Sequence, residues 1–236
     1  AFFVRWHLSG IPEVKLRDWR LKVGGEAAGK ALEFDMATLR REFEQVELVA
    51  VCQCSGNRRG MFQPHVAGVE WGVGAMGNAR WTGVRLRDVL DKAGVKGGAI
   101  EVAFNGADGG VFPATPDFVK SIPVDKARDE HTMIAFEMNG KPLPAANGFP
   151  ARLIVPGWTG TYWMKQLTDL DIRTKPQGGF WMNPAYRVPA GRFPKADAFA
   201  TQATPANTPI TDIVVNSLVT SIHDGERVHR GQTVEV

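Results

Sequence analysis

Short apolar runs broken by turn-forming residues dominate this sequence of 236 residues and constrain its fold more than any other feature. Its 26 glycines and 15 prolines recur so often that long helices are excluded as the main element. The runs at residues 45–51, 99–104 and 152–156 are rich in apolar and β-branched residues, which predicts strands, and the first is expected to be buried. A further strand is expected at 131–138, entering a turn at Asn139-Gly140.

The helices predicted from the sequence are few and short. Residues 35–43 form a candidate helix with Asp35 as its N-cap. Residues 82–94 carry apolar side chains at helical spacing and end at Gly94, a suitable C-cap. Residues 117–127 are expected to form a strand and then a short helix. Together with the strands, these segments predict a mixed α+β fold of many short elements.

The chain changes character after about residue 175, where glycine and proline become crowded. Beyond this stretch, 213–219 and 226–236 are predicted to be strands of an all-β module. We therefore expect one domain at 1–205 and the start of a second at 206–236. The chain opens at Ala1 in an apolar run and stops inside a predicted strand, so we expect it to be a piece of a longer protein.

Composition narrows the classes of partner. The formal net charge of +3 is too small to predict nucleic-acid binding, although it suits an anionic substrate. No run of 18 apolar residues occurs, so no membrane span is predicted. Seven tryptophans are many for this length, and we expect several of them to line a pocket or an interface.

The only two cysteines, Cys52 and Cys54, are separated by one residue. That spacing strains a disulfide, and the pair supplies too few ligands for zinc. Cys52 falls in an apolar run and is expected in the core. Cys54 lies beyond the run, just before Arg58 and Arg59, which favour a thiolate. A thiolate there could be a nucleophile, or a soft metal ligand whose cofactor supplies the other ligands.

The arginines themselves suggest an anion. Guanidinium groups such as those of Arg58 and Arg59 match the geometry of small oxyanions. A second basic site lies at Arg5 and His7, which share one face if this segment is extended. A surface salt bridge is an equally good explanation for Arg5 when it is considered alone.

Six motifs, and Lys165 beyond them, resemble the sulfite oxidase family and occur in the family's order across the chain to about residue 190. They are Phe3-Val-Arg-Trp-His7, Cys54-Ser-Gly-Asn-Arg-Arg59, Gly74-Ala-Met-Gly-Asn-Ala-Arg-Trp-Thr-Gly-Val84, Ser121-Ile-Pro123, Met138-Asn-Gly-Lys-Pro-Leu-Pro144 and Gly148-Phe-Pro-Ala-Arg-Leu-Ile-Val-Pro-Gly157. One such motif is a weak signal, but six in order are a strong one. Within the family, the sequence is most similar to bacterial sulfite dehydrogenases that donate electrons to cytochrome c.

The resemblance implies a molybdopterin-binding domain of mixed sheets and short helices, followed by an immunoglobulin-like module. It implies a molybdenum cofactor in which the molybdopterin dithiolene supplies two sulfurs and Cys54 supplies a third. One protein thiolate is then enough, and Cys52 keeps its core assignment. The implied substrate-site residues are Arg5, Arg59, Tyr186 and Trp71. The implied cofactor-binding residues, besides Cys54, are Phe3, Val4, Arg5, Trp6, His7, Asp108, Asn147, Arg152, Trp163, Met164 and Lys165.

Two positions depart from the family pattern. Asn147 stands where the family usually has a histidine, and an amide cannot become cationic. Thr161 and Tyr162 replace a family Gly-x-Arg segment, so one cationic contact to the cofactor is missing. Arg152 and Lys165 are therefore expected to carry more of that role, while Arg58 is either structural or lines the route to the electron acceptor.

The activity implied by the resemblance is the oxidation of sulfite to sulfate, with electrons passed singly to a c-type cytochrome. The sequence contains no CxxCH haem-attachment motif, so the acceptor is expected to be a separate subunit, a separate protein or a missing part of the chain. A periplasmic location and a dimer formed through the C-terminal module are further expectations from the family.

Three rival functions remain. Assimilatory nitrate reductases share this cofactor domain and run oxygen transfer in the opposite direction. Methionine sulfoxide reductases with molybdopterin resemble the sequence less around the metal cysteine and lack the two arginines. The third rival is an oxyanion-binding or interaction module that has lost its metal, which the substitution at Asn147 keeps open.

Overall fold

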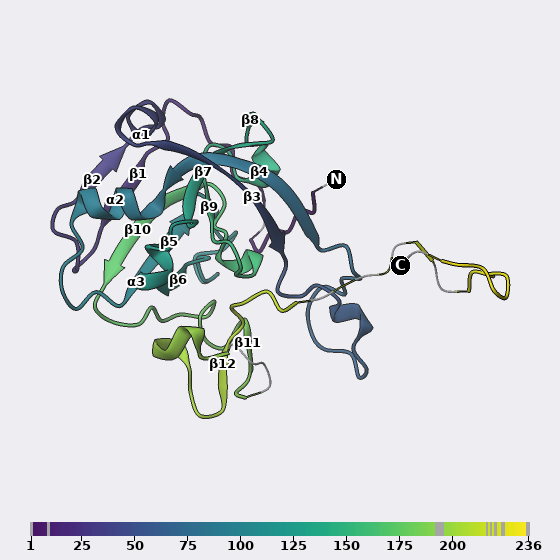
Figure 1. The fold of residues 1–236 in the computed structure, drawn as a ribbon. Coiled ribbons are helices and arrows are strands. Elements are labelled where there is room, and N and C mark those ends of the chain that lie inside the picture. The colour runs from purple at the N-terminus through teal and green to yellow at the C-terminus, as the bar shows by residue number, and fades with distance from the viewer. Residues whose placement is uncertain are drawn as a thin grey trace.

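The computed structural model describes residues 2–8, 10–191, 196–215, 217, 219, 221–222 and 225–234. Two five-stranded sheets form the body of the molecule, with short helices beside them (Figure 1). The predicted mixed α+β fold is therefore confirmed. None of the helices that the structure describes is long and apolar enough to cross a membrane.

The first sheet has the strand order β2-β1-β10-β5-β6. Its only parallel pair is β1 with β10, and the other neighbours are antiparallel. The strands are β1 (Leu21–Gly24), β2 (Leu32–Phe34), β5 (Glu101–Gly106), β6 (Lys120–Pro123) and β10 (Leu167–Arg173). The helix η3 (Gly160–Tyr162) separates β9 (Arg152–Ile154) from β10 along the chain, and Leu153 N of β9 donates to Met164 O at 2.8 Å, which places the residues just before β10 beside the second sheet.

The second sheet has the order β3-β4-β7-β8, and β9 also pairs with β7. All of its pairs are antiparallel. The strands are β3 (Gln45–Gln53), β4 (Met76–Arg85), β7 (Met133–Met138), β8 (Lys141–Pro142) and β9 (Arg152–Ile154). The β7–β8 turn is the predicted one, and Asn139 and Gly140 both have positive φ, as a tight hairpin turn requires.

The three α-helices are α1 (Met36–Glu42), α2 (Leu86–Ala93) and α3 (Val124–Ala127). Helix α1 begins as predicted, because Asp35 Oδ1 accepts a hydrogen bond from Thr38 N at 2.7 Å. Helix α2 ends at Gly94 as predicted but begins at Leu86, so the expected start four residues earlier was wrong. Residues 82–85 belong to β4 instead. A Cβ at Gly83 would lie 2.0 Å from a carbonyl oxygen of β7. The absence of a side chain at Gly83 therefore allows β4 to pair with β7 at the residues where a helix was expected.

Strand β3 is longer than predicted and only partly buried, so the expectation of a buried strand was wrong for its first half. It lies at the edge of its sheet, and Val49 in its middle is 61% exposed. Its last residues, including Cys52, are buried. Burial therefore increases along β3 toward the cysteines, which places them inside the molecule.

The C-terminal part differs from the prediction. Strands β11 (Arg187–Pro189) and β12 (Asn207–Pro209) form a small antiparallel sheet of their own. Within 213–219 and 226–236, the described residues form no strand, so the two strands predicted there are not observed in them. The described residues also form the 3₁₀ helices η1 (Arg59–Met61), η2 (Ala145–Asn147), η3 (Gly160–Tyr162) and η4 (Ala196–Gln202). The domain boundary near 205 and the immunoglobulin-like module stay predictions.

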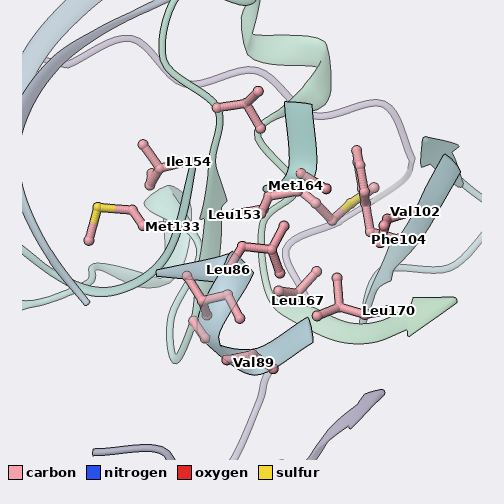
Figure 2. Packing of buried hydrophobic residues seen from close by; sticks show 14 of the residues in the cluster. Leu86, Val89, Val102, Phe104, Met133, Leu153, Ile154, Met164, Leu167 and Leu170 are labelled. Carbon is pink, nitrogen blue, oxygen red and sulfur yellow. The ribbon is translucent and has the colours of Figure 1, made fainter. Parts of the chain in front are cut away.

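Helix α2 packs its apolar face into the main hydrophobic core (Figure 2). Leu86 and Val89 point toward Leu153 of β9 and toward Leu167 and Leu170 of β10, and all five are essentially inaccessible to solvent. Fully burying a side chain of this size stabilises the fold by roughly 1.5–3 kcal/mol. The core thus joins the two sheets and fixes β9 and β10 beside each other.

A buried carboxylate attaches the later part of the chain to this body. Glu101 of β5 is inaccessible to solvent and accepts hydrogen bonds from Ser121 Oγ at 2.7 Å and Gln177 N at 2.9 Å. It also accepts bonds from Thr201 Oγ1 at 2.7 Å and Gln202 Nε2 at 3.0 Å. Four donors from three separate segments therefore converge on one side chain, which fixes Gln177 and the Thr201–Gln202 pair beside β5.

We expect Glu101→Ala to lower the free energy of unfolding by roughly 2–4 kcal/mol, because it leaves the buried Ser121 hydroxyl and three partly buried donors without their acceptor. Urea unfolding monitored by circular dichroism measures the change. Glu130→Ala is the matched control, since the Glu130 side chain is 68% exposed. Equal stability of the two variants would contradict the anchoring role of Glu101.

Candidate active site

Segments far apart in the sequence converge on one pocket. It holds about 660 Å³ of empty space, counting its mouth open to solvent, of which only about 50 Å³ is wide enough for the centres of water molecules. It is therefore a narrow slot. Its walls are Phe3, Arg5, Trp6, His7, Cys52, Cys54, Ser55, Asp108, Phe118, Ala146, Asn147, Arg152, Gly160, Thr161, Trp163, Met164, Lys165 and Tyr186.

The two cysteines enter the pocket from the end of β3. Cys54 lies just past the strand, is partly exposed, and its Sγ accepts a hydrogen bond from Gly56 N at 3.4 Å. Cys52 is fully buried, and burial raises the pKa of its thiol to about 11. A Cβ at Gly160 would lie 2.9 Å from Cys52 Sγ, so glycine is required for that close approach. The prediction that Cys52 belongs to the core is confirmed, but the thiol also lines the pocket wall.

The loop after Cys54 is held by its own polar residues. Ser55 Oγ donates to Thr159 Oγ1 at 2.8 Å, which joins the loop to the segment before η3. Asn57 Oδ1 accepts a hydrogen bond from Ala75 N at 3.0 Å, and Cys54 N donates to Ala75 O at 2.9 Å. The Cys54-Ser-Gly-Asn stretch thus fixes the partly exposed thiol against β4.

Arg59 lies beside the pocket without forming part of its wall. Its Nη1 donates to Val69 O at 3.2 Å. Its guanidinium packs against Gly56 and Gly68. A Cβ atom added at Gly56 would lie 2.7 Å from the guanidinium, and one added at Gly68 would lie 2.4 Å from it, so both positions require glycine. The charge of Arg59 nevertheless reaches Tyr186, where it partly offsets the rise in pKa to about 12 that burial causes.

A buried arginine and a partly buried lysine line the pocket. Arg152 is 5% exposed, and its guanidinium lies 5.4 Å and 5.8 Å from the ring centres of Trp81 and Trp163. Lys165 Nζ donates to Arg5 O at 2.7 Å and lies 3.4 Å from the ring centre of Trp6. Burial lowers the pKa of Lys165 to about 7, and the neighbouring Arg152 lowers it further. Both groups are therefore desolvated cations held largely by aromatic faces and backbone carbonyls.

The pocket leaves positive charge and hydrogen-bond donors unsatisfied. None of the ion pairs that the structure describes includes Arg5, Arg152 or Lys165. The buried Trp6 Nε1 and Arg152 Nε have no partner in the described part of the chain. Asp108 is the one carboxylic acid in the wall, and burial raises the pKa of that acid, which favours its neutral form. Buried donors and cations of this kind indicate that the pocket binds an anionic, acceptor-rich ligand.

His7 and Tyr186 face each other across the pocket, and His7 Nε2 is hydrogen-bonded to the Tyr186 hydroxyl. The His7 ring stacks on Phe118 with ring centres 3.9 Å apart. The pKa of His7 is lowered to about 3. Burial is the larger cause, and the nearby positive charge of Arg5 is the second. Tyr186 has φ of 59°, a left-handed conformation that costs a non-glycine residue roughly 1–3 kcal/mol. The surrounding contacts therefore maintain a strained backbone that directs the hydroxyl into the pocket.

Most residues chosen from the sequence meet in this pocket. Those in the wall are Phe3, Arg5, Trp6, His7, Cys54, Asp108, Asn147, Arg152, Trp163, Met164, Lys165 and Tyr186. Val4, Arg59 and Trp71 are not in the wall: Val4 is 42% exposed, and Trp71 packs edge-on against Phe3 at 6.2 Å between ring centres. The sequence analysis missed Cys52, Ser55, Phe118, Ala146, Gly160 and Thr161 as wall residues. For Cys52 a signal existed, because residues two apart in an extended run share a face.

A comparison with protein families defines the class. The family profile described as the oxidoreductase molybdopterin-binding domain matches residues 7–181, which is most of the chain. The chain therefore belongs to this family of oxidoreductase domains. The resemblance to the sulfite oxidase family that the motifs predicted is confirmed.

Individual relatives agree with this family. Over 237 residues, the chain is 35% identical to the mitochondrial sulfite oxidase of Homo sapiens, covering 98% of this chain and 42% of that protein. It is also 36% identical over 177 residues to the NAD(P)H nitrate reductase of Hordeum vulgare, covering 70% of this chain and 19% of that protein. Among solved structures, the sulfane dehydrogenase SoxCD from Paracoccus pantotrophus matches with a TM-score of 0.68 and 33% identity, over 78% of this chain and 45% of that chain. The chain thus spans less than half the length of the human sulfite oxidase.

The cofactor of the family fits the residues of the pocket. Molybdopterin carries a phosphate and a planar, hydrogen-bonding ring system, and the narrow slot offers cations and buried donors for both. Cys54 offers a soft thiolate ligand for molybdenum at the pocket wall. No cluster of three or more His, Cys, Asp or Glu side chains that could hold a metal occurs in the described residues, so one thiolate suffices only if the cofactor brings further ligands. The predicted molybdenum–molybdopterin cofactor is confirmed by the family and agrees with this donor set.

We expect Cys54→Ser to lose more than nine-tenths of the bound molybdenum or to hold it without activity, because a hydroxyl is a poor ligand for this metal. Mass spectrometry of the metal and of the released pterin measures both components. Cys52→Ser is the matched control and should retain molybdenum while losing stability, because a buried hydroxyl replaces an apolar thiol. Full molybdenum content and activity in Cys54→Ser would refute its assignment as the ligand.

His7 should make the domain less stable in acid. The unfolded histidine accepts a proton near pH 6.5, whereas the folded imidazole stays neutral down to about pH 3. The stability gained from this group is therefore present above pH 6.5 and is lost as the pH falls toward 3. Urea unfolding of wild type and His7→Gln between pH 4 and 8 tests this expectation. The variant should lose less stability on acidification, and an identical pH slope would contradict the prediction.

Proposed function

We propose that the protein containing this domain oxidises sulfite to sulfate. The observation that carries the proposal is the combination, in one pocket, of the Cys54 thiol, unneutralised cations and a directed Tyr186 hydroxyl. Sulfite is a small anion whose three oxygens can accept bonds from these groups. The 35% identity with a sulfite oxidase over nearly the whole chain supports the same substrate.

The chain's own residues bind and orient the substrate. Arg5 and the Tyr186 hydroxyl, both in the pocket wall, are proposed to hold sulfite oxygens. Arg59 lies just outside the wall and supplies positive potential that attracts the anion and reaches Tyr186. Trp71 has an indirect role, because it supports Phe3 in the wall. Holding the oxygens on the protein would leave the sulfur atom free to react.

A second group of residues is proposed to hold the cofactor. Arg152 and Lys165 would bind its phosphate, and Asn147, Asp108 and His7 would bind its polar edges. The remaining wall residues from the sequence prediction, Phe3, Trp6, Trp163 and Met164, shape the slot. Because Val4 is exposed outside the wall, it has no part in this proposal.

The reaction converts sulfite and water into sulfate, two protons and two electrons. When bound, the molybdenum centre supplies the oxygen-transfer chemistry and accepts the electron pair. The protein restricts which atom of sulfite approaches the metal and surrounds the anion with preorganised positive charge. Tyr186 would donate a hydrogen bond without adding a charge, which favours release of the dianionic product.

The proposed electron acceptor is a c-type cytochrome, and the proposed location is the periplasm. A two-electron oxidation coupled to a one-electron carrier requires the electrons to leave singly. A dimer formed through a C-terminal module is proposed from the family resemblance alone.

A second candidate function is the oxidation of sulfane sulfur. It is favoured by the match to the solved sulfane dehydrogenase SoxCD at 33% identity. The nitrate reductase match supports the opposite direction of oxygen transfer as a further rival. The same pocket chemistry suits sulfite and nitrate, because both are small anions with three acceptor oxygens, whereas a sulfane sulfur carries no oxygen that these donors could bind.

Steady-state assays of the molybdenum-loaded protein decide between these functions. We expect sulfite to reduce cytochrome c with this protein as catalyst, while nitrate is not consumed with reduced viologen and protein-bound sulfane sulfur is a poor donor. Rapid reduction of oxygen without reduction of cytochrome c would contradict the proposed acceptor. Consumption of nitrate or sulfane sulfur with no activity on sulfite would contradict the proposed substrate.

Arg5→Gln should lower kcat/KM for sulfite by roughly 10–150-fold, because one charge-assisted hydrogen bond is worth roughly 1.5–3 kcal/mol. The control is Arg41→Gln, whose side chain is 66% exposed on α1. Molybdenum content should be measured in both variants, so that lost cofactor is not mistaken for lost substrate binding. An unchanged kcat/KM in Arg5→Gln with full molybdenum content would remove Arg5 from the substrate site.

A further inference from the structure

A buried lysine lies behind the pocket and takes no part in its wall. Lys120, the first residue of β6, is inaccessible to solvent. Its Nζ donates to Trp181 O at 2.7 Å. The same ammonium group lies 4.7 Å from the ring centre of Tyr162 and 5.1 Å from that of Tyr186. Lys120 therefore contacts the back of the tyrosine that directs its hydroxyl into the pocket.

The surroundings of Lys120 contain no compensating acid. None of the ion pairs in the described part of the chain includes it. The titratable groups that face it are Tyr162, Tyr186, His7 and Arg187, and burial followed by the charge of Arg187 lowers the pKa of Lys120 to about 7. A buried cation without a carboxylate is costly. An apolar residue would fill a strand position in this core at lower cost, so the charge or the donor has a role.

The contacts of Lys120 converge on the segment from Trp181 to Tyr186. Trp181 packs against Phe118 and His7, which both line the pocket, with ring centres 5.0 Å and 5.3 Å apart. Its Nε1 donates to Pro116 O at 3.0 Å. One bond from Lys120 therefore fixes the indole that backs His7, and the same ammonium group supports the strained Tyr186.

We infer that Lys120 is a positioning residue for the binding of small oxyanions: it fixes Trp181 from behind and holds its buried positive charge against the ring of Tyr186. It acts through Tyr186 and does not touch the anion. Lys120 would thus help to determine how tightly the pocket binds an anion. Only the sulfite-turnover test of this role rests on the proposed function. Sulfate binding tests it independently.

A sulfate titration by calorimetry of the molybdenum-loaded protein at pH 6 is the test. We expect Lys120→Met to weaken sulfate binding roughly 10-fold or more, because it removes a buried positive charge that lies 5.1 Å from the ring centre of Tyr186. In turnover, KM for sulfite should rise while kcat changes by less than about three-fold. Lys141→Met, at an exposed lysine of β8, is the matched control and should match wild type.

A double-mutant cycle separates positioning from a general structural role. If Lys120 acts through Tyr186, then Lys120→Met should change sulfate affinity little in a protein that already carries Tyr186→Phe. Fully additive effects, or sulfate affinity in Lys120→Met within about two-fold of wild type, would overturn the inference.

A measurement on the wild-type protein covers the case in which Lys120→Met does not fold. Lysine ¹³C NMR, with the Lys120 signal assigned by its absence in Lys120→Arg, should show its pKa rising when sulfate saturates the site. An unchanged pKa would overturn the inference. Wild-type protein that binds sulfate yet fails to oxidise sulfite would refute the proposed function and leave the role of Lys120 standing.

Discussion

Buried positive charge without acidic partners is the constraint on which the site depends. Arg152 is desolvated among tryptophan rings, and Lys165 is held by the carbonyl oxygen of Arg5 and the face of Trp6. Such an arrangement is unfavourable until an anion occupies the pocket. The desolvated cations therefore increase the affinity of the pocket for an anionic ligand. The two sheets make this tolerable, because their shared core fixes β9 and β10, which position both cations.

Backbone placement gives the site its chemistry. Increasing burial along β3 carries the chain from an exposed edge into the molecule, where Cys52 is enclosed and Cys54 remains partly accessible. Glycines at 56, 68 and 160 permit the close approaches that fix Arg59 and Cys52. The opposite wall depends on Glu101, which attaches the segment carrying Tyr186 to the first sheet. Cys54, the proposed metal ligand, therefore lies just past the second sheet, whereas Tyr186, the proposed substrate donor, lies in a segment attached to the first sheet.

Local signals predicted much of this structure. Several short elements were predicted from the Asp35 cap, the helix end at Gly94 and the apolar runs. Most residues of the pocket wall were predicted from the motifs that occur in the family's order. What failed depends on long-range contacts. Pairing of β4 with β7 overrode a helical pattern, and the edge position of β3 exposed residues that an apolar run suggests are buried. Lys120 gave no signal, because nothing local indicates that its strand faces Tyr186.

X-ray absorption spectroscopy at the molybdenum edge tests the central claim most directly, because it counts the sulfur atoms bound to the metal. The account predicts three sulfur ligands in the wild-type protein, two from the dithiolene and one from Cys54. It predicts that one of these is lost in Cys54→Ser and none in Cys52→Ser. Only two sulfurs in wild type, or three retained in Cys54→Ser, would contradict the proposal that Cys54 and the cofactor together form the metal centre.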